Sequence, residues 1–169
     1  ANAQPGTYYI VFSKDGQSFK YPYEIASRRE GSAERTSFTT ADMIYLIMPD
    51  RFANGDPSND SVEGMPDKAD RSKPFGRHGG DIQGIIDHLD YISELGATAI
   101  WCTPLIEDNL EKTTYHGYAC TDYYHIDGRF GDNDLYKTYV EKAHEKDLKI
   151  IMDIVPKHPA SGHRWIADV

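Results

Sequence analysis

The sequence predicts an α/β fold with parallel strands, arranged either as a doubly wound sheet or as a (β/α)8 barrel. From residue 43 onward, apolar runs of strand length alternate with amphipathic segments of helical period, in the order strand, helix, strand, helix, strand. Such alternation is typical of parallel strands joined by right-handed crossovers. No Gly-x-Gly-x-x-Gly motif follows a strand, so the sequence does not support a dinucleotide site.

The first forty residues have a different pattern. Aromatic and β-branched side chains are concentrated in residues 7–13 and 17–26, and Asp15-Gly16 between the two runs is a strong hairpin signal. We therefore expect two antiparallel strands there. Residues 28–40 are polar and charged without apolar periodicity, which predicts a linker into a second region.

The elements of the second region follow from its apolar pattern. Residues 43–48 form a continuous apolar run before Pro49, which is typical of a strand buried on both faces. From residue 81 to 96, apolar side chains recur every three or four positions and Gly96 is placed as a stop, so we expect one amphipathic helix. Residues 97–103 are predicted to be a second apolar strand.

A second amphipathic helix is predicted over residues 132–147 and a third strand over residues 148–155, with no helix after it. The connections over residues 49–80 and 104–131 are long, and such loops in compact domains are usually functional. They follow strand ends, where a barrel carries its active site. Because a complete barrel needs about 250 residues, we expect this chain to be the front portion of a larger protein.

Composition argues against several classes of partner. The 169 residues carry 27 acidic and 18 basic side chains, a formal charge of −9, which argues against nucleic acid or an anionic membrane. No apolar run approaches the roughly 18 residues of a membrane span, and the sequence as given shows no signal peptide. Cys102 and Cys120 lack metal or redox spacing, so we expect unpaired structural thiols.

Two polar segments are candidates for cation binding. Residues 50–60 crowd Asn and Asp oxygens into a turn with Gly and Pro. Such oxygens are ligands of Ca²⁺, but the same composition is typical of a solvated turn. In His78-Gly79-Gly80-Asp81, the Asp opens the predicted helix and is well suited to be its N-cap.

Two further segments have features of a sugar site. Residues 115–127 form an aromatic-rich loop with interspersed polar groups, which suits the apolar face and the hydroxyls of a pyranose. The alternative is that these Tyr residues pack the loop. Asp153 lies in an apolar strand, where a carboxylate is costly unless it is paired, and His158 is either a site residue or an ordinary polar loop residue.

Taken in this order, the segments resemble the α-amylase family of glycoside hydrolases. The resemblance is to the neopullulanase and cyclomaltodextrinase branch, including starch-use enzymes of gut Bacteroidetes. It covers nearly the whole chain and rests on residues 50–60, 78–96, 99–105, 115–131 and 152–158.

This resemblance implies a domain organisation. Residues 1–27 are expected to be the end of an N-terminal β-sandwich module, and residues 28–40 to be a linker. Residues 41–169 are then the N-terminal part of a catalytic (β/α)8 TIM barrel, with the first three of its strands.

The resemblance also implies a Ca²⁺ site that joins the loop after the first barrel strand to the start of the following helix. Its expected ligands are Asn54, Asp56, Asn59, Asp60, the Gly79 carbonyl and Asp81.

The same resemblance implies a sugar site. Tyr118 matches the residue that stacks on the sugar at the cleavage subsite, His158 matches a His that hydrogen-bonds its hydroxyls, and His116 is assigned to substrate binding. Asp153 is expected to support the site without being the nucleophile. Lys157 stands where the family usually has Asn, which alters the hydrogen bonding at the base of the site.

The implied activity is retaining hydrolysis or transfer at α-1,4 or α-1,6 bonds of α-glucans such as starch, maltooligosaccharides, cyclodextrins and pullulan. In relatives the three catalytic carboxylates come from strands four, five and seven, so we expect no catalytic residue in this chain. The family favours a periplasmic or extracellular location. Two alternatives remain: a non-catalytic, calcium-dependent α-glucan-binding remnant, and an unrelated parallel α/β enzyme whose loops match by chance.

Overall fold

The computed structural model describes residues 3–35 and 37–167, in two units that comprise residues 1–37 and 38–169. The first unit is a hairpin of β1 (Gly6–Lys14) and β2 (Gln17–Ile25), paired antiparallel with Phe12 opposite Phe19. Asp15 and Gly16 both have positive φ angles, of 50° and 79°, as a two-residue hairpin turn requires. The predicted hairpin is confirmed.

Both faces of this hairpin are exposed within the first unit. Its exposed aromatic side chains include Tyr9, Phe12, Phe19 and Tyr21. An isolated two-stranded hairpin is marginally stable at best, so such a ribbon needs further strands or another layer to bury its aromatic residues. The assignment of residues 1–27 to a β-sandwich module stays a prediction.

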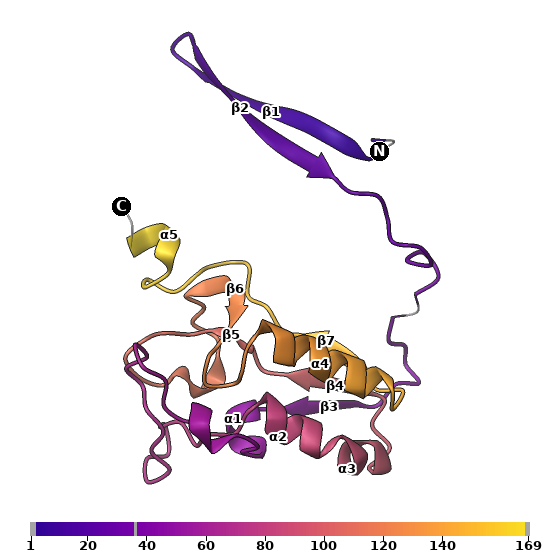
Figure 1. Ribbon diagram of the computed structural model, residues 1–169, viewed down its shortest axis with the longest axis vertical. Coiled ribbons are helices and arrows are strands. Elements are labelled where there is room, and N and C mark those ends of the chain that lie inside the picture. Colours follow the sequence, from indigo (N-terminus) through magenta and orange to yellow (C-terminus); the bar gives the residue numbers. More distant parts are fainter. Residues whose placement is uncertain (1–2, 36, 168–169) are drawn as a thin grey trace. The chain divides into compact units, whose positions relative to one another are not determined.

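The second unit contains a parallel sheet in the order β3-β4-β7. The strands are β3 (Ile44–Ile47), β4 (Ala99–Cys102) and β7 (Lys149–Met152), and they lie side by side in Figure 1. Ile44 pairs with Ala99, which pairs in turn with Lys149. This order confirms the predicted parallel α/β arrangement.

The first crossover contains two short helices where the sequence predicted one. They are α2 (Ile82–Asp87) and α3 (Leu89–Glu94), and the interruption falls at His88. Its ring Nδ1 donates to the Gly84 carbonyl at 2.7 Å, the group that the His88 backbone N–H would bond in a continuous helix. That N–H bonds the Ile85 carbonyl instead, at 3.0 Å. Gly96, with φ of 83°, ends the segment as predicted.

The second crossover is α4 (Asn133–His144). Asp132 is its N-cap, and the carboxylate accepts from the backbone N–H groups of Asp134 at 3.0 Å and Leu135 at 2.7 Å. Tyr139 and Ala143 on its inner face are fully buried. The predicted helix is therefore confirmed, with its expected apolar face in the core.

One face of the parallel sheet packs against these helices. The buried core cluster comprises Ile47, Ile82, Ile85, Ile86, Leu89, Ile92, Ala97, Ile100, Cys102, Leu105, Ile126, Phe130, Tyr139, Ala143 and Leu148. Cys102 and Cys120 are both buried and free, as predicted.

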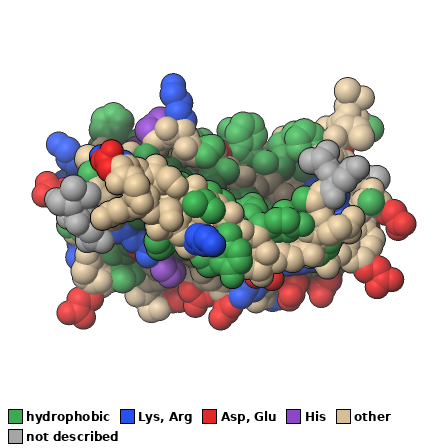
Figure 2. Space-filling view, turned by 90° about the horizontal axis from the view of Figure 1, so that it is seen from above, with side chains coloured by type: hydrophobic (Ala, Val, Ile, Leu, Met, Phe, Trp, Pro, Cys, Tyr) green, Lys and Arg blue, Asp and Glu red, His purple; other side chains and the backbone are tan. Residues whose placement is uncertain are grey.

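The other face of the sheet is open. Leu46 is 57% exposed and Trp101, its partner in the register, is 38% exposed. The prediction that residues 43–48 are buried on both faces is therefore wrong, because no second layer from the described residues covers this side. Figure 2, a view from above Figure 1, shows hydrophobic side chains exposed at the protein surface and Asp and Glu side chains mainly toward the margins of the view, without singling out this sheet.

The long connections contain short elements. The loop after β3 includes α1 (Pro49–Phe52) and the 3-10 helix η1 (Pro57–Asn59), and the loop after β4 includes the 3-10 helix η2 (Thr114–His116). In the latter loop, β5 (Ile106–Glu107) and β6 (Asp122–Ile126) pair antiparallel.

After β7 there is a short helix, α5 (Arg164–Ala167), where the sequence predicted none. Among the described helices, none combines the length and hydropathy needed to span a membrane.

Candidate functional site

The candidate residues follow the carboxyl ends of the three parallel strands. The loop after β3 carries the oxygen-rich turn, the loop after β4 carries the aromatic segment, and Asp153 directly follows β7. In a parallel sheet with crossover helices these ends meet at one edge. The fold thus brings side chains from three distant segments to one side of the sheet.

Asp81 joins the turn after β3 to the start of α2. Its buried carboxylate caps the helix, because Oδ1 accepts from the Gly84 N–H at 2.6 Å. Oδ1 also accepts from the Gly55 N–H at 3.0 Å, and Oδ2 from the Asp56 N–H at 2.8 Å. The Asn59 amide donates to Oδ2 at 3.3 Å. The N-cap prediction is confirmed, and the same carboxylate fixes the turn.

Two amide oxygens in this turn lack hydrogen-bond partners. Within the described part of the chain, Asn54 Oδ1 and Asn59 Oδ1 are buried and accept no hydrogen bond. The Asn54 amide nitrogen donates to Asp60 Oδ1 at 2.6 Å. Buried polar atoms are rarely left unpaired, and amide and carboxylate oxygens are the ligands that Ca²⁺ prefers. The donor set therefore fits a hard cation.

Gly79 packs closely against this turn. Its φ is 86°, and a Cβ at this position would lie 2.4 Å from Asp60 Oδ1 and 2.9 Å from Asn54 Nδ2. Because no side chain fits there, only glycine lets the backbone approach the side chains of Asp60 and Asn54 so closely. The expected residues Asn54, Asn59, Asp60, Gly79 and Asp81 are thus together in the structure.

Asp56 is oriented differently from the other expected ligands. It is exposed, and its Oδ1 accepts from the backbone N–H and the hydroxyl of Ser58, at 3.0 and 2.6 Å. These bonds lower the pKa of Asp56 and make it the N-cap of η1. Across residues 3–35 and 37–167, no group of three or more His, Cys, Asp or Glu side chains has metal-binding geometry.

Asp153 connects the ends of β4 and β7 with the aromatic loop. Its Oδ2 accepts from the Trp101 indole N–H at 3.1 Å and from the Tyr118 hydroxyl at 3.0 Å. The two donors explain how a carboxylate is tolerated beside an apolar strand. Burial, followed by the hydrogen bond to Asp153, raises the pKa of Tyr118. The Tyr118 side chain remains 41% exposed, so its ring is accessible to a ligand.

His116 supports the backbone of Tyr118. Its Nδ1 accepts from the Tyr118 N–H at 2.9 Å, and the two ring centroids are 5.9 Å apart. Burial lowers the pKa of His116. The adjacent Tyr115 packs under the Arg51 guanidinium, 4.3 Å from its ring centroid, so this Tyr packs the loop rather than facing a ligand.

The structure does not bring His158 into this group. His158 and Lys157 are exposed, and within the described residues no hydrogen bond, ion pair or ring contact links His158 to Tyr118, His116 or Asp153. The role of His158 in sugar binding stays a prediction.

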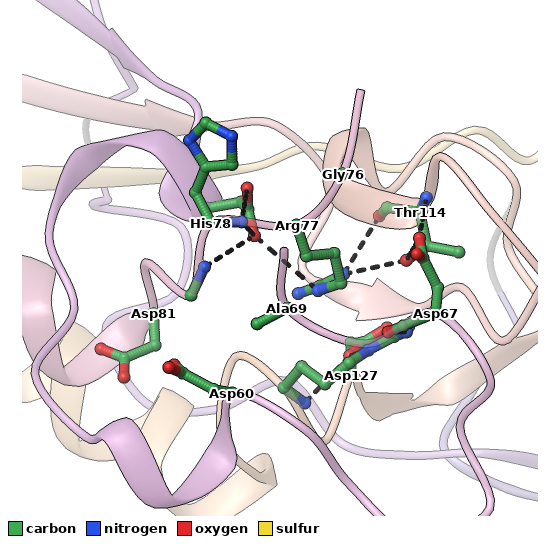
Figure 3. A network of polar contacts seen from close by, with 12 residues as sticks. Asp60, Asp67, Ala69, Gly76, Arg77, His78, Asp81, Thr114 and Asp127 are labelled. Atoms are coloured by element: carbon green, nitrogen blue, oxygen red, sulfur yellow. Dashed lines mark hydrogen bonds and ion pairs between the residues drawn. The ribbon is translucent and has the colours of Figure 1, made fainter. Parts of the chain in front are cut away.

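Sequence reasoning missed a buried ionic network between the two long loops. Arg129 forms two bonds to Asp127, from Nε to Oδ1 at 2.9 Å and from Nη2 to Oδ2 at 2.7 Å. Arg77 lies between Asp50 and Thr114, and Figure 3 shows it beside Asp67 and Asp127. The sequence feature that indicates this ion pair is the spacing Asp127-Gly128-Arg129, because opposite charges on either side of a Gly are well placed to pair within one turn.

Asp108 is a second group that the sequence did not reveal. It is buried, its Oδ2 accepts from the Ala119 N–H at 3.2 Å, and its Oδ1 has no partner among the described residues. Burial raises its pKa to about 7. No periodicity or motif distinguishes this Asp from the acidic residues around it.

The parallel sheet with helices on one face, and the polar and aromatic residues beyond its carboxyl ends, define an α/β protein and agree with part of a TIM barrel. Residues 46–169 match the family model described as alpha amylase, catalytic domain. The chain therefore belongs to the alpha-amylase family, as its motifs predicted.

Named relatives agree with the predicted branch. The chain is 42% identical over 127 residues to a cyclomaltodextrinase of Bacillus sp, covering 75% of this chain and 22% of the relative. It is 42% identical over 138 residues to neopullulanase 2 of Thermoactinomyces vulgaris, covering 77% and 22%. An Anoxybacillus alpha-amylase structure matches with a TM-score of 0.67 and 47% identity, covering 75% and 26%. The chain thus spans about a quarter or less of these proteins.

Proposed function

We propose that this chain is part of a glycoside hydrolase that cleaves α-glucans with retention of configuration. The observation that carries the proposal is the exposed Tyr118 ring at the strand ends, held by its hydroxyl to Asp153 in a chain of the alpha-amylase family. The names of the relatives, cyclomaltodextrinase and neopullulanase, indicate α-glucan substrates for those proteins.

The Tyr118 ring offers a stacking surface for a sugar. A pyranose has an apolar face that packs on an aromatic ring and hydroxyls that need polar partners. Because Asp153 holds the hydroxyl and His116 the backbone N–H, the ring is fixed before a sugar arrives. A preorganised ring loses little conformational freedom on binding.

Asp153 acts in this proposal as a supporting residue. Retaining hydrolysis needs a carboxylate nucleophile and a carboxylic acid about 5–5.5 Å apart. Asp153 instead uses Oδ2 to orient Trp101 and Tyr118. We propose that the catalytic carboxylates come from later strands of the barrel, as the family resemblance implies.

We also propose that a Ca²⁺ ion stabilises the turn after β3. The residues that would hold it are Asn54, Asn59, Asp60, the Gly79 carbonyl and Asp81, with Asp56 at the edge. The support is the pair of buried, unpaired amide oxygens of Asn54 and Asn59 beside two carboxylates. When bound, the ion supplies charge and ligand bonds that hold the turn against α2, and it takes no part in bond cleavage.

We make two further proposals, one on the fold of the N-terminal unit and one on the cellular location of the protein. The exposed aromatic residues on both faces of the β1-β2 hairpin support its assignment to a β-sandwich module. The family resemblance supports a periplasmic or extracellular protein.

The function is tested with the intact protein and maltooligosaccharides, cyclodextrin and pullulan. We expect reducing sugar to appear with the α-anomer first, as followed by NMR, and Tyr118→Ala to lower kcat/KM by about 10- to 100-fold, equivalent to ~1.4–3 kcal/mol. Tyr124→Ala is the control, because Tyr124 is an exposed Tyr in the same connection whose ring contact is to Arg164; it should have little effect.

Two results would change the conclusion. Absence of both hydrolysis and binding for all three substrates contradicts the proposal. Calcium-dependent binding without hydrolysis identifies the protein as a glucan-binding remnant.

A further inference from the structure

Arg77 is a buried charge that the proposed sugar and calcium sites do not use. It is 1% exposed, and its guanidinium lies 4.5 Å from the centroid of the buried Phe130 ring. Burial lowers its pKa to about 10, so it is still a cation at neutral pH. Because a charge is costly to bury, its position calls for specific partners.

One set of partners lies in the loop after β4. Arg77 Nη1 donates to both the carbonyl and the hydroxyl oxygen of Thr114, each at 3.2 Å (Figure 3). Asp67 Oδ2 accepts from the N–H and the hydroxyl of the same Thr114, at 3.0 and 2.9 Å. Thr114 is thus held through backbone and side chain from two residues of the loop after β3.

Thr114 begins the short segment that leads to Tyr118. It opens η2, which ends at His116, and the His116 ring binds the Tyr118 N–H. The segment is flanked by residues with positive φ, Thr113 at 61° and Gly117 at 75°. A non-Gly residue in this region is strained and persists where the surroundings enforce it. The bonds to Thr114 hold the residue that directly follows Thr113 in this segment.

A second contact of Arg77 is with Asp50 in the loop after β3. Arg77 Nε lies 3.7 Å from Asp50 Oδ1, and both side chains are fully buried. The Asp50 carboxylate also accepts from the N–H groups of His78 and Gly79. Arg77 therefore connects the hydrogen-bonded turn at Asp50 with the start of the Tyr118 segment.

We propose that Arg77 is a positioning residue for the Tyr118 ring: by clamping Thr114 against Asp50, it holds the stacking surface in place. This inference rests on the proposed sugar-binding role of Tyr118. The side chain acts through Thr114 and His116 and does not itself touch the sugar.

The first test uses Arg77→Met in the intact protein, at a temperature where circular dichroism shows it folded. We expect KM for maltooligosaccharides to rise about tenfold with a smaller change in kcat, because the ring binds sugar but is misplaced. In a Tyr118→Ala background the same substitution should have no further effect on KM. Arg71→Met is the control, because exposed Arg71 lies in the same loop and bonds the His78 carbonyl instead.

An unchanged KM in folded Arg77→Met overturns the proposal, and so does an equal rise in KM in the Tyr118→Ala background. If Arg77→Met does not fold, Thr114→Val replaces it, because it removes only the hydroxyl that both Arg77 and Asp67 contact. A KM equal to that of the wild type in this variant also overturns the proposal.

A second readout is independent of sugar binding. Fluorotyrosine placed at position 118 should give one sharp ¹⁹F signal in the wild-type protein and a shifted or broadened signal in the Arg77→Met or Thr114→Val variant. An identical signal overturns the positioning role even if the protein binds no glucan. Failure of the proposed function is recognised separately, by wild-type protein that neither binds nor cleaves α-glucans.

Discussion

At the residue scale, a single carboxylate accepts hydrogen bonds from several backbone N–H groups. Asp81 caps α2 and accepts hydrogen bonds from two N–H groups of the turn after β3, and Asp50 accepts from the N–H groups of His78 and Gly79. Buried N–H groups that lose their acceptor carry a desolvation cost. A few Asp residues therefore determine the shape of a long loop that has little regular structure of its own.

Asp81→Ala is expected to lower the free energy of unfolding of the intact protein by about 2–3 kcal/mol, because a helix cap and two further N–H partners are lost. Asp132→Ala is the matched control, since Asp132 caps α4 and is not one of the proposed ion ligands; it should cost about 1 kcal/mol. Denaturant unfolding with and without chelator measures both effects. Chelator should destabilise the wild type and Asp132→Ala but not Asp81→Ala, and equal chelator effects on all three would contradict the calcium proposal.

Asp108 is expected to make stability depend on pH. Its pKa is raised to about 7 in the folded protein by burial, against about 3.9 in an unfolded chain. Between these two pH values the folded state holds a proton that the unfolded state loses. The resulting contribution to the free energy of unfolding is complete below about pH 3.9 and is lost as pH rises to about 7. Asp108→Asn should remove this pH dependence. The free energy of unfolding of the variant, relative to that of the wild type, should be higher at pH 8 than at pH 4 by more than about 1.4 kcal/mol. Parallel pH profiles for both proteins would show the prediction to be wrong.

At the element scale, the sequence predicted the strands and helices better than their boundaries. The 81–96 segment has a helical apolar period, and its apolar residues are indeed buried, but the helix is interrupted at His88. At the interruption, the His88 side chain bonds the Gly84 carbonyl in place of its own backbone N–H. Apolar periodicity carries no information about such a bond.

Ile85 on α2 and Leu95 after α3 allow a paired test of this packing. Ile85 is completely buried and Leu95 is 44% exposed. Ile85→Ala should lower the free energy of unfolding of the intact protein by about 2–5 kcal/mol through lost burial and a cavity, whereas Leu95→Ala should cost less than about 1 kcal/mol. Equal costs in chemical denaturation would mean that α2 does not pack on the sheet as described.

At the scale of the whole molecule, apolar surface is exposed in each unit. The β1-β2 hairpin exposes aromatic residues on both faces, and the parallel sheet exposes Leu46 and Trp101 on the face away from the helices. Exposed patches of this kind mark surfaces that other segments or partners cover. The open face fits a barrel in which further strands bury Leu46 and Trp101.

The isolated 169-residue chain is therefore expected to bind the dye ANS and to unfold without a sharp cooperative transition. Calorimetry and near-ultraviolet circular dichroism measure this, with the intact protein as the control. A single sharp melting transition of the isolated chain, without dye binding, would contradict the expectation.

The sequence by itself determined the α/β class, the hairpin, the family and most of the residues around the oxygen-rich turn. It did so because periodicity, turn residues and motif order are local properties of the chain. Only the tertiary structure decided which side chains meet: Tyr118 bonds Asp153 across 35 positions, and Arg77 bonds Thr114 across 37. It also showed Asp56 turned toward Ser58 and His158 exposed. The contacts of Tyr118 and Arg77 depend on how distant loops pack, which no local pattern encodes.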